Sequence, residues 1–233
     1  FDKKDIINKN YSSITSKKGL NKLVNQIKNC DLLSIDLETT SINPMIAEIV
    51  GVSISIESNV GYYIPFLLKD EKNIIIDSDY QKYAMLTIKE IFEDENIKKV
   101  GQNIKYDGLI LSRYGIDLRG IYIDTMVAAQ ILNPSSRSYK LDSLSIEYLN
   151  YNMVPIEDLI GSGKDQITMD EVPIEKITYY SAEDADVALQ LAKLFIPRLE
   201  KNNQIEFFQK IEMPLISVLI SMEKDGVFIN QNI

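Results

Sequence analysis

The sequence contains no histidine and a single cysteine, Cys30. The absence of histidine excludes Ser-His-Asp and Cys-His catalysis, zinc sites of the HExxH type and zinc-finger frameworks. The lone cysteine excludes an internal disulfide and any CxxC site. Acid–base chemistry in this chain would therefore fall to carboxylates, lysine, tyrosine or metal-bound water.

Long apolar runs and a secretory signal are also lacking. No apolar stretch approaches the roughly 18 residues needed to cross a membrane. The opening residues FDKKDIINKN are polar, unlike a signal peptide. We therefore expect no membrane partner and a cytoplasmic location.

Positive charge is in the minority. The 233 residues carry 25 Lys and Arg against 34 Asp and Glu, which gives a formal net charge of −9. A generic nucleic-acid binder is usually basic, so composition alone disfavours that class and fits a metal-binding or a plain cytosolic protein equally well. The length and the 45% hydrophobic content allow one large domain, or one domain with a fragment of another.

The hydrophobic pattern predicts a mixed α/β sheet with helices packed on it. Residues 1–16 are interpreted as a polar lead-in, 152–172 as irregular, and Asn59 to Gly61 as a hairpin turn. Strands are expected at 32–35, 48–56, 60–66, 98–101 and 121–123. Helices are expected at 17–29, 79–94, 104–114, 125–132 with Asp124 as its cap, 141–149, 173–200 and 203–224.

Two carboxylates end the first predicted strand, in Asp36-Leu37-Glu38. Residues two apart on a strand point to the same face, so the two acids would lie side by side. The alternative is that the strand ends in solvent and the acids mark the turn. Adjacent like charges destabilise a fold unless a positive group lies between them, and a divalent cation is the obvious candidate.

Two further polar pairs occur at helical spacing. Asn103 and Asp107 lie four residues apart at the start of a predicted helix, and Tyr180 and Asp184 lie four apart within the long one. Taken alone, the first pair is explained equally by an N-cap and a first-turn acid, and the second by a solvated acidic patch. The apolar residues around Asp184 make its helix partly buried, however, and an acid there needs a partner.

Three motifs in this order resemble those of DEDDy-type 3′→5′ exonucleases: Asp36-x-Glu38, Asn103-x-x-x-Asp107 and Tyr180-x-x-x-Asp184. Their flanks resemble the proofreading domain of bacterial DNA polymerase I, a family A polymerase. The flanking segments are KVGQNIKYD at 99–107, YGIDLRG at 114–120, DTM at 124–126 and AEDADV at 182–187. The resemblance covers nearly the whole chain from about residue 20, and the segment 211–230 resembles the start of a polymerase domain.

The resemblance implies an RNase H-like α/β fold with a mixed five-stranded sheet flanked by helices. It implies an exonuclease domain at 1–200 and a truncated, helical start of the polymerase domain at 201–233. It also implies a single-stranded or frayed 3′ end of DNA as substrate and the polymerase domain of the same chain as partner. The setting would be a monomeric protein of the bacterial cytoplasm.

The resemblance further implies roles for the motif residues. Asp36, Glu38 and Asp184 would bind one divalent ion. Asp36 would also bridge to a second ion, which Asp107 would reach through water. Tyr180, together with Glu38, would orient the attacking water. All five positions are filled, so the sequence gives no sign of an inactivated relative.

The resemblance also implies substrate-binding positions: Thr39, Ile42, Gln102, Asn103, Lys105, Tyr106 and Arg137. At Arg137 the local alignment allows a shift of one residue. Ile42 occupies a place where the family packs an apolar side chain on the terminal base, and ordinary core packing is the alternative.

The residue types support the same chemistry without the family. In the absence of histidine no side chain has an unperturbed pKa near 7, and tyrosine, with a reference pKa of about 10, can aim a water but is a poor base. Hydroxide would then come from a metal that lowers the pKa of its bound water. Oxygen ligands without His or Cys favour Mg²⁺ or Mn²⁺ over Zn²⁺, and two such ions would stabilise both the attacking and the leaving oxygen.

Three functions remain open at this point. The leading one is 3′→5′ exonucleolytic proofreading of DNA within a longer polymerase. The second is an exoribonuclease of the RNase D type, which shares the five motif residues. The third is a catalytically silent, strand-binding scaffold. The polymerase-like segment 211–230 favours the first.

We expect Asp36→Ala or Asp184→Ala to abolish metal-dependent nucleotide release while leaving the fold intact, because each change removes a metal ligand. Tyr180→Phe should slow release less, because it removes one hydrogen bond and no ligand. Release from 3′-labelled single-stranded DNA measures activity, and circular dichroism checks the fold. Unchanged release by either aspartate variant would refute the site, and a Tyr180→Phe loss equal to that of Asp36→Ala would give the tyrosine more than an orienting role.

Overall fold

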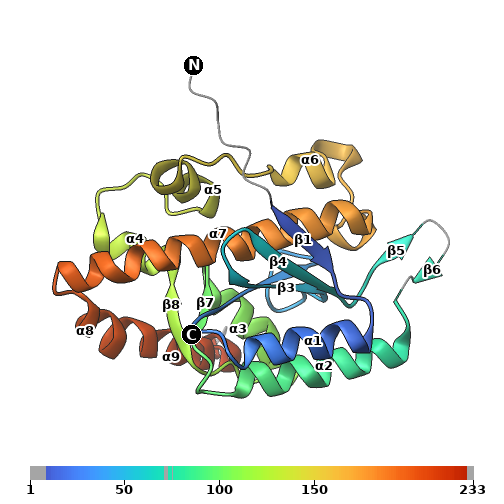
Figure 1. The fold of residues 1–233 in the computed structure, drawn as a ribbon, viewed down its shortest axis with the longest axis horizontal. Coiled ribbons are helices and arrows are strands. Elements are labelled where there is room, and N and C mark those ends of the chain that lie inside the picture. The colour runs from blue at the N-terminus through green and yellow to red at the C-terminus, as the bar shows by residue number, and fades with distance from the viewer. Residues whose placement is uncertain (1–8, 71–72, 75, 230–233) are drawn as a thin grey trace.

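Within residues 9–70, 73–74 and 76–229, which the computed structural model describes, a six-stranded mixed sheet forms the centre of the protein (Figure 1). Its strand order is β1-β4-β3-β2-β7-β8. The strands are β1 (Asn10–Ser13), β2 (Leu33–Thr39), β3 (Ile49–Glu57), β4 (Val60–Pro65), β7 (Lys99–Gly101) and β8 (Ile121–Asp124). A separate ribbon pairs β5 (Lys69–Asp70) with β6 (Asn73–Ile74).

The sheet combines both kinds of strand pairing. β2 with β3 and β3 with β4 are antiparallel, whereas β1 with β4, β2 with β7 and β7 with β8 are parallel. The expected hairpin is confirmed: β3 and β4 are joined at Asn59, whose φ is +67°, a left-handed value that asparagine tolerates in tight turns. The mixed α/β class predicted from the sequence is therefore confirmed.

The sheet has one strand more than the five expected, and this corrects the interpretation of 1–16 as a lead-in. Asn10–Ser13 pair in parallel with residues 60–63 at the sheet edge. The hydroxyl of Tyr11 also donates a 2.6 Å hydrogen bond to the buried carboxylate of Asp186. Backbone hydrogen bonds and one long-range side-chain bond hold β1, so its polar sequence carried no hydrophobic signal of a strand.

Helices surround this sheet. They are α1 (Lys17–Ile27), α2 (Ser78–Glu93), α3 (Ile104–Arg113), α4 (Thr125–Leu132), α5 (Leu141–Leu144), α6 (Ile156–Ile160), α7 (Ile174–Lys201), α8 (Ile205–Phe207) and α9 (Met213–Asp225). Two π-helical turns lie at Ser145–Leu149 and Phe208–Glu212, and two 3₁₀ turns at Gly163–Asp165 and Met169–Glu171. No helix in the described part of the chain is long and apolar enough to cross a membrane.

Most predicted helices are confirmed, with small differences at their ends. The exceptions are short interruptions. The helix expected at 141–149 is α5 followed by a π-helical turn, and the one expected at 203–224 is α8, a π-helical turn and α9. The segment 152–172, expected to be irregular, contains α6 and both 3₁₀ turns.

The long helix α7 packs across one side of the sheet, against β1, β2, β3, β4 and β7. Figure 1 shows α1 and α2 side by side on the opposite side. Strand β2 is covered on both faces as a result. Its apolar residues Leu33, Ile35 and Leu37 are buried and alternate with Ser34, Asp36 and Glu38 on the other face. The fold thus brings the polar face of β2 under α7.

One buried carboxylate caps two helices. Asp124, at the end of β8, accepts hydrogen bonds from the backbone N–H groups of Met126 (2.9 Å) and Val127 (3.3 Å) at the start of α4. It also accepts from Asn103 (3.2 Å) and Ile104 (2.9 Å) at the start of α3. The predicted cap of α4 is confirmed, and the same side chain unexpectedly also caps α3.

Two glycines with left-handed φ differ in the space around them and can be compared by substitution with alanine. Gly120 (φ +68°) precedes β8, and a Cβ there would lie 2.5 Å from the carbonyl oxygen of Ile97. Gly115 (φ +70°) follows α3, and a Cβ there would meet nothing within 4 Å. We expect Gly115→Ala to lower the free energy of unfolding by about 1 kcal/mol and Gly120→Ala by about 2 kcal/mol more, since only the latter meets backbone. Urea unfolding of both variants measures this, and equal losses would contradict it.

Candidate active site

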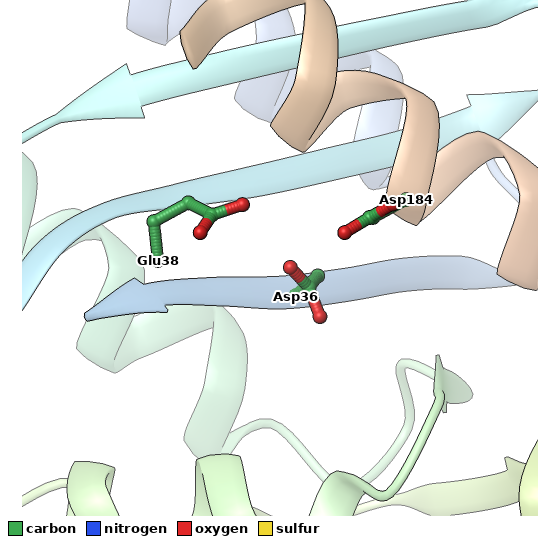
Figure 2. Close-up of side chains that lie close together, drawn as sticks. All are labelled: Asp36, Glu38 and Asp184. Carbon is green, nitrogen blue, oxygen red and sulfur yellow. The ribbon is translucent and has the colours of Figure 1, made fainter. Parts of the chain in front are cut away.

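Three carboxylates meet where α7 crosses β2. Asp36 and Glu38 project from β2, and Asp184 projects from α7 toward them (Figure 2). One oxygen atom from each of the three lies within 4.8 Å of the others. The predicted side-by-side placement of Asp36 and Glu38 is therefore present, and the reading of these acids as an exposed turn is wrong. An acid from a segment far away in the sequence joins them.

Burial and mutual repulsion disfavour the ionised forms of these three groups. Burial, and then the neighbouring charge of Glu38, hold the pKa of Asp36 well above its usual value. Burial, and then the charges of Asp36 and Glu38, do the same to Asp184. Burial raises the pKa of Glu38 to about 7, although the Ser181 hydroxyl donates a 2.7 Å hydrogen bond that lowers it. The cluster at neutral pH lacks a positive charge, which a bound cation would supply.

Asp107 is the fourth carboxylate of the site. It lies on the first turn of α3 and is only 3% exposed. Burial, and then the charges of Asp36, Asp124 and Glu38, raise its pKa well above the usual value, and a hydrogen bond from the backbone N–H of Leu37 opposes that rise. Its buried Oδ2 has no hydrogen-bond partner among the described residues.

The donor set fits a hard divalent cation. All four groups present carboxylate oxygens, and three of them converge within reach of one ion. The unpartnered Oδ2 of Asp107 is a buried polar atom whose desolvation is uncompensated, and a cation or its water would satisfy it. The carboxylates present therefore match Mg²⁺ or Mn²⁺ better than a softer metal.

Tyr180 lies one helical turn before Asp184 on α7, as its spacing predicts. Its hydroxyl forms a hydrogen bond with Asp184. Burial, and then the charges of Asp184, Glu38 and Asp36, raise the pKa of Tyr180. The phenol is therefore neutral at physiological pH and acts as a hydrogen-bonding group, which agrees with the chemistry inferred from its residue type.

The residues after β2 form one polar junction with α3. The hydroxyls of Thr39 and Tyr106 are 2.9 Å apart, and both donate to the carbonyl oxygen of Ser41. Next to this junction Ile42 is 96% exposed. Core packing, the alternative for Ile42, is therefore wrong, and this side chain stands free on the surface beside the site.

The two residues before α3 have different roles in the structure. The side-chain amide of Gln102 donates to the carbonyl oxygen of Tyr139 (2.7 Å) and accepts from the hydroxyl of Thr125. It therefore ties β7 to the segment before α5. Asn103 holds the N-cap position with φ +57°, but its side chain makes no capping bond because Asp124 caps the helix instead. The half-buried amide of Asn103 is thus not used as a cap.

The two basic residues predicted to bind substrate, Lys105 and Arg137, make no contact with the carboxylate cluster among the interactions described for them. Lys105 forms an ion pair with Glu223 of α9. Arg137 is exposed on the segment between α4 and α5. A cavity of about 280 Å³ does adjoin the cluster, between Tyr180 and Asp184 on α7, residues 140–142 and residues 153–157.

Two acids on α7 are structural, and the reading of this stretch as a solvated acidic patch is wrong. Glu183 is fully buried and accepts hydrogen bonds from the Tyr151 hydroxyl and from the backbone N–H of Val154 at 2.7 Å. Asp186 is also fully buried and pairs with Lys9 at 2.8 Å. Glu183 thereby fixes the segment 151–154, which leads into one wall of the cavity.

Sequence reasoning missed Ser181, the hydrogen-bond donor to Glu38. Its position three residues before Asp184 puts it near the same face of α7, which is the one signal that could have found it. The hydroxyl of a serine within a helix can bond to a carbonyl oxygen of the preceding turn. The sequence alone therefore gives no reason to expect that Ser181 bonds to a distant side chain.

The matching family model and the curated relatives agree on one family. A family model described as 3′-5′ exonuclease matches residues 11–200. DNA polymerase I of Borreliella burgdorferi is 36% identical over 97% of this chain and 24% of its own length, and that of Rhizobium leguminosarum is 34% identical over 96% of this chain and 23% of its own length. The chain thus spans about a quarter of the length of the curated relatives it matches.

A solved structure shows the same fold. It is the POL domain of Pol1 from M. smegmatis in complex with DNA primer-template and dNTP, with a TM-score of 0.72 at 17% identity. The match covers 94% of this chain and 33% of that one. The likeness, with the sheet and helices described above, confirms the expected RNase H-like fold.

The raised pKa of Glu38 predicts a pH dependence of stability in the absence of divalent ions. A carboxyl with a folded-state pKa of about 7 and a usual value of 4.5 holds its proton more tightly when folded. The protonated Glu38 therefore contributes fully to the stability of the fold below pH 4.5. This contribution is lost as the pH rises toward 7, because the carboxyl group then loses its proton. We expect wild type to lose on the order of 3 kcal/mol relative to Glu38→Gln over this window, and Mg²⁺ to restore stability at neutral pH.

Urea unfolding at a series of pH values, with EDTA or with Mg²⁺, measures this difference. Glu57→Gln is the matched control, because Glu57 is exposed at the end of β3 and outside the cluster. Parallel pH profiles for wild type and Glu38→Gln would contradict the assignment.

Proposed function

This chain belongs to the 3′→5′ exonuclease family of DNA polymerase I, and from that membership we propose that it removes nucleotides from the 3′ end of DNA with two divalent metal ions. The observation that carries the proposal is the cluster of the half-buried Asp36 and Asp184 with the buried Glu38, with Asp107 and Tyr180 beside it. Its proposed role is proofreading within a longer polymerase.

The carboxylates divide into two ligand sets in this proposal. Asp36, Glu38 and Asp184 hold one ion, and their converging oxygens support that assignment. Asp36 and Asp107 hold the second, supported by the unpartnered Oδ2 of Asp107. When bound, the ions lower the pKa of water and neutralise the charge of the phosphate undergoing in-line displacement.

The chain's own groups orient the water and hold the strand. The Ser181 hydroxyl donates a hydrogen bond to Oε1 of Glu38, which leaves Oε2 to bind a metal ion or a water molecule. The neutral Tyr180 hydroxyl, bonded to Asp184, is a second group that aims the water. Glu38 and Tyr180 thus fix the direction from which the water attacks the phosphate. Neither side chain needs to act as the base that removes the proton of this water.

The terminal nucleotide lies in this proposal between the surface at Ile42 and the cavity beside Tyr180. The exposed isoleucine offers an apolar contact to a base, and the cavity offers room next to the carboxylates. The hydroxyls of Thr39 and Tyr106 hold the loop in place by donating hydrogen bonds to the carbonyl oxygen of Ser41, the residue before Ile42. Asn103 and Arg137 are exposed or half-exposed and available to the strand. The side chain of Gln102 is hydrogen-bonded within the protein. Its role in this proposal is therefore to hold the segment before α3 and not to contact the strand directly.

The C-terminal helices support a partner within the same protein. α9 and the turn before it carry an exposed apolar face at helical spacing, consisting of Ile211, Leu215, Val218 and Met222. Such a face is unfavourable in water unless another element covers it. The division proposed for the chain is an exonuclease domain at 1–200 followed by the start of a polymerase domain at 201–233, which this face would join.

The two other functions have weaker support. The curated relatives named above are DNA polymerases, which disfavours an RNase D-like exoribonuclease. A silent scaffold has no use for four buried or half-buried carboxylates with raised pKa values, because like charges removed from water are costly to keep without a cation.

We expect the protein to release 5′-mononucleotides from 3′-labelled DNA in Mg²⁺ or Mn²⁺ and to release none in EDTA. Single-stranded DNA and a duplex with a mismatched 3′ end should be degraded about tenfold faster than a paired duplex, because a mismatched end costs less to unpair. Matched RNA substrates and the Asp36→Ala variant are the controls. Preference for RNA would favour the exoribonuclease, and no degradation of any substrate would favour the scaffold.

A further inference from the structure

Gly108 is the residue directly after Asp107, and it lies where α9 crosses α3. A Cβ placed on Gly108 would lie 2.4 Å from Cδ1 of Ile220 and 3.4 Å from its Cγ1. With the Ile220 side chain in this conformation, only a residue without a side chain leaves room for its Cδ1 against α3. The helix that carries Asp107 is therefore in tight contact with α9 at the next residue.

A second contact repeats along the same crossing. Lys105 lies three residues before Gly108 on α3, and Glu223 lies three residues after Ile220 on α9. Lys105 and Glu223 form an ion pair. Since residues three apart share a helix face, the two contacts lie in line along the two helices.

Asp107 is held from the opposite side by the sheet. Its carboxylate accepts a hydrogen bond from the backbone N–H of Leu37 on β2, between Asp36 and Glu38. α3 is thus fixed between β2, on the side of the carboxylate cluster, and α9 behind it. A shift of α3 away from either neighbour would move Asp107 relative to Asp36.

We propose that α9 is part of the scaffold of the nuclease site, and that Gly108 and Ile220 are positioning residues that set the place of Asp107. This inference rests on the proposed function, because it concerns the second ion assigned to Asp36 and Asp107. It also places α9, which lies outside residues 11–200 of the family match and beyond the proposed boundary at 200, within the working unit of the exonuclease.

The test uses Gly108→Ala in the full chain, with Mn²⁺ titrated by calorimetry in the presence of thymidine 5′-monophosphate. The added methyl pushes against Cδ1 of Ile220, so the second ion should bind about tenfold more weakly, a typical effect for a group that supports a metal ligand. The first ion, held by Asp36, Glu38 and Asp184, should bind as in wild type. A general loss of folding would weaken both ions together.

Rescue gives the sharper readout. Ile220→Val removes Cδ1, the atom that a Cβ on Gly108 would meet, and leaves the nearest atom at an ordinary contact distance of 3.4 Å. The double variant Gly108→Ala/Ile220→Val should therefore return the affinity for the second ion to within about twofold of Ile220→Val alone. Ser221→Ala, at an exposed position of α9 next to Ile220 and outside the apolar face, is the matched control and should change neither ion.

The outcomes separate this inference from the proposed function. Wild type that binds two Mn²⁺ and degrades DNA, with Gly108→Ala unchanged in its second affinity, overturns the inference alone. Wild type that binds fewer than two ions overturns the proposed two-ion site and this inference with it. Ile220→Ala, which removes the packing without adding an atom, gives the same test if Gly108→Ala does not fold: selective weakening of the second ion supports the inference, and equal binding overturns it.

Discussion

The mutual repulsion of four carboxylates in one buried place is the constraint around which this protein is built. Asp36, Glu38, Asp107 and Asp184 each have a raised pKa, with burial as the largest cause and, except at Glu38, the charge of the others next. Removing such charges from water costs several kcal/mol per group unless an opposite charge is close. In the proposed function, a bound divalent ion would convert the same repulsion into binding free energy.

Hydrogen bonding distinguishes these acids from the structural acids nearby. Glu183 and Asp186 are as buried as any group on α7, but hydroxyls, backbone N–H groups or a lysine satisfy them. Asp107 keeps an oxygen without a partner among the described residues, and Asp36 and Asp184 lie mainly beside other acids. Two acids two residues apart on one helix therefore have different surroundings: Asp184 lies among other acids, whereas Asp186 accepts hydrogen bonds and pairs with a lysine. The hydrogen-bond partners of each acid, and not its burial, distinguish the proposed metal ligands from the structural acids.

Much of the fold was predictable from the sequence, because the information is local, whereas only the family resemblance predicted that Asp107 and Asp184 join Asp36 and Glu38. Apolar spacing gave the main helices and strands, and the spacing of Asp36 and Glu38 on a strand gave their common face. The edge strand β1 was not predictable, since backbone pairing and a bond from Tyr11 to Asp186, 175 residues away, hold it in place.

The substrate side was harder to predict for a similar reason. The ion pair of Lys105 with Glu223 joins residues 118 apart, and the exposure of Ile42 depends on how the whole loop folds. Neither leaves a trace in spacing or composition. Asn103 has the residue type of a cap, but Asp124 takes that role from a different strand.

The double cap at Asp124 has a mechanical consequence. A single carboxylate at the end of β8 caps two helices, so α3 and α4 share one anchor and cannot tilt independently without leaving backbone N–H groups unsatisfied. The wall of the site that carries Asp107 is therefore stiff. The cavity beside Tyr180 is bordered by residues of the short α5 and α6, which do not share this anchor and are held instead through the hydrogen bond from Val154 to Glu183.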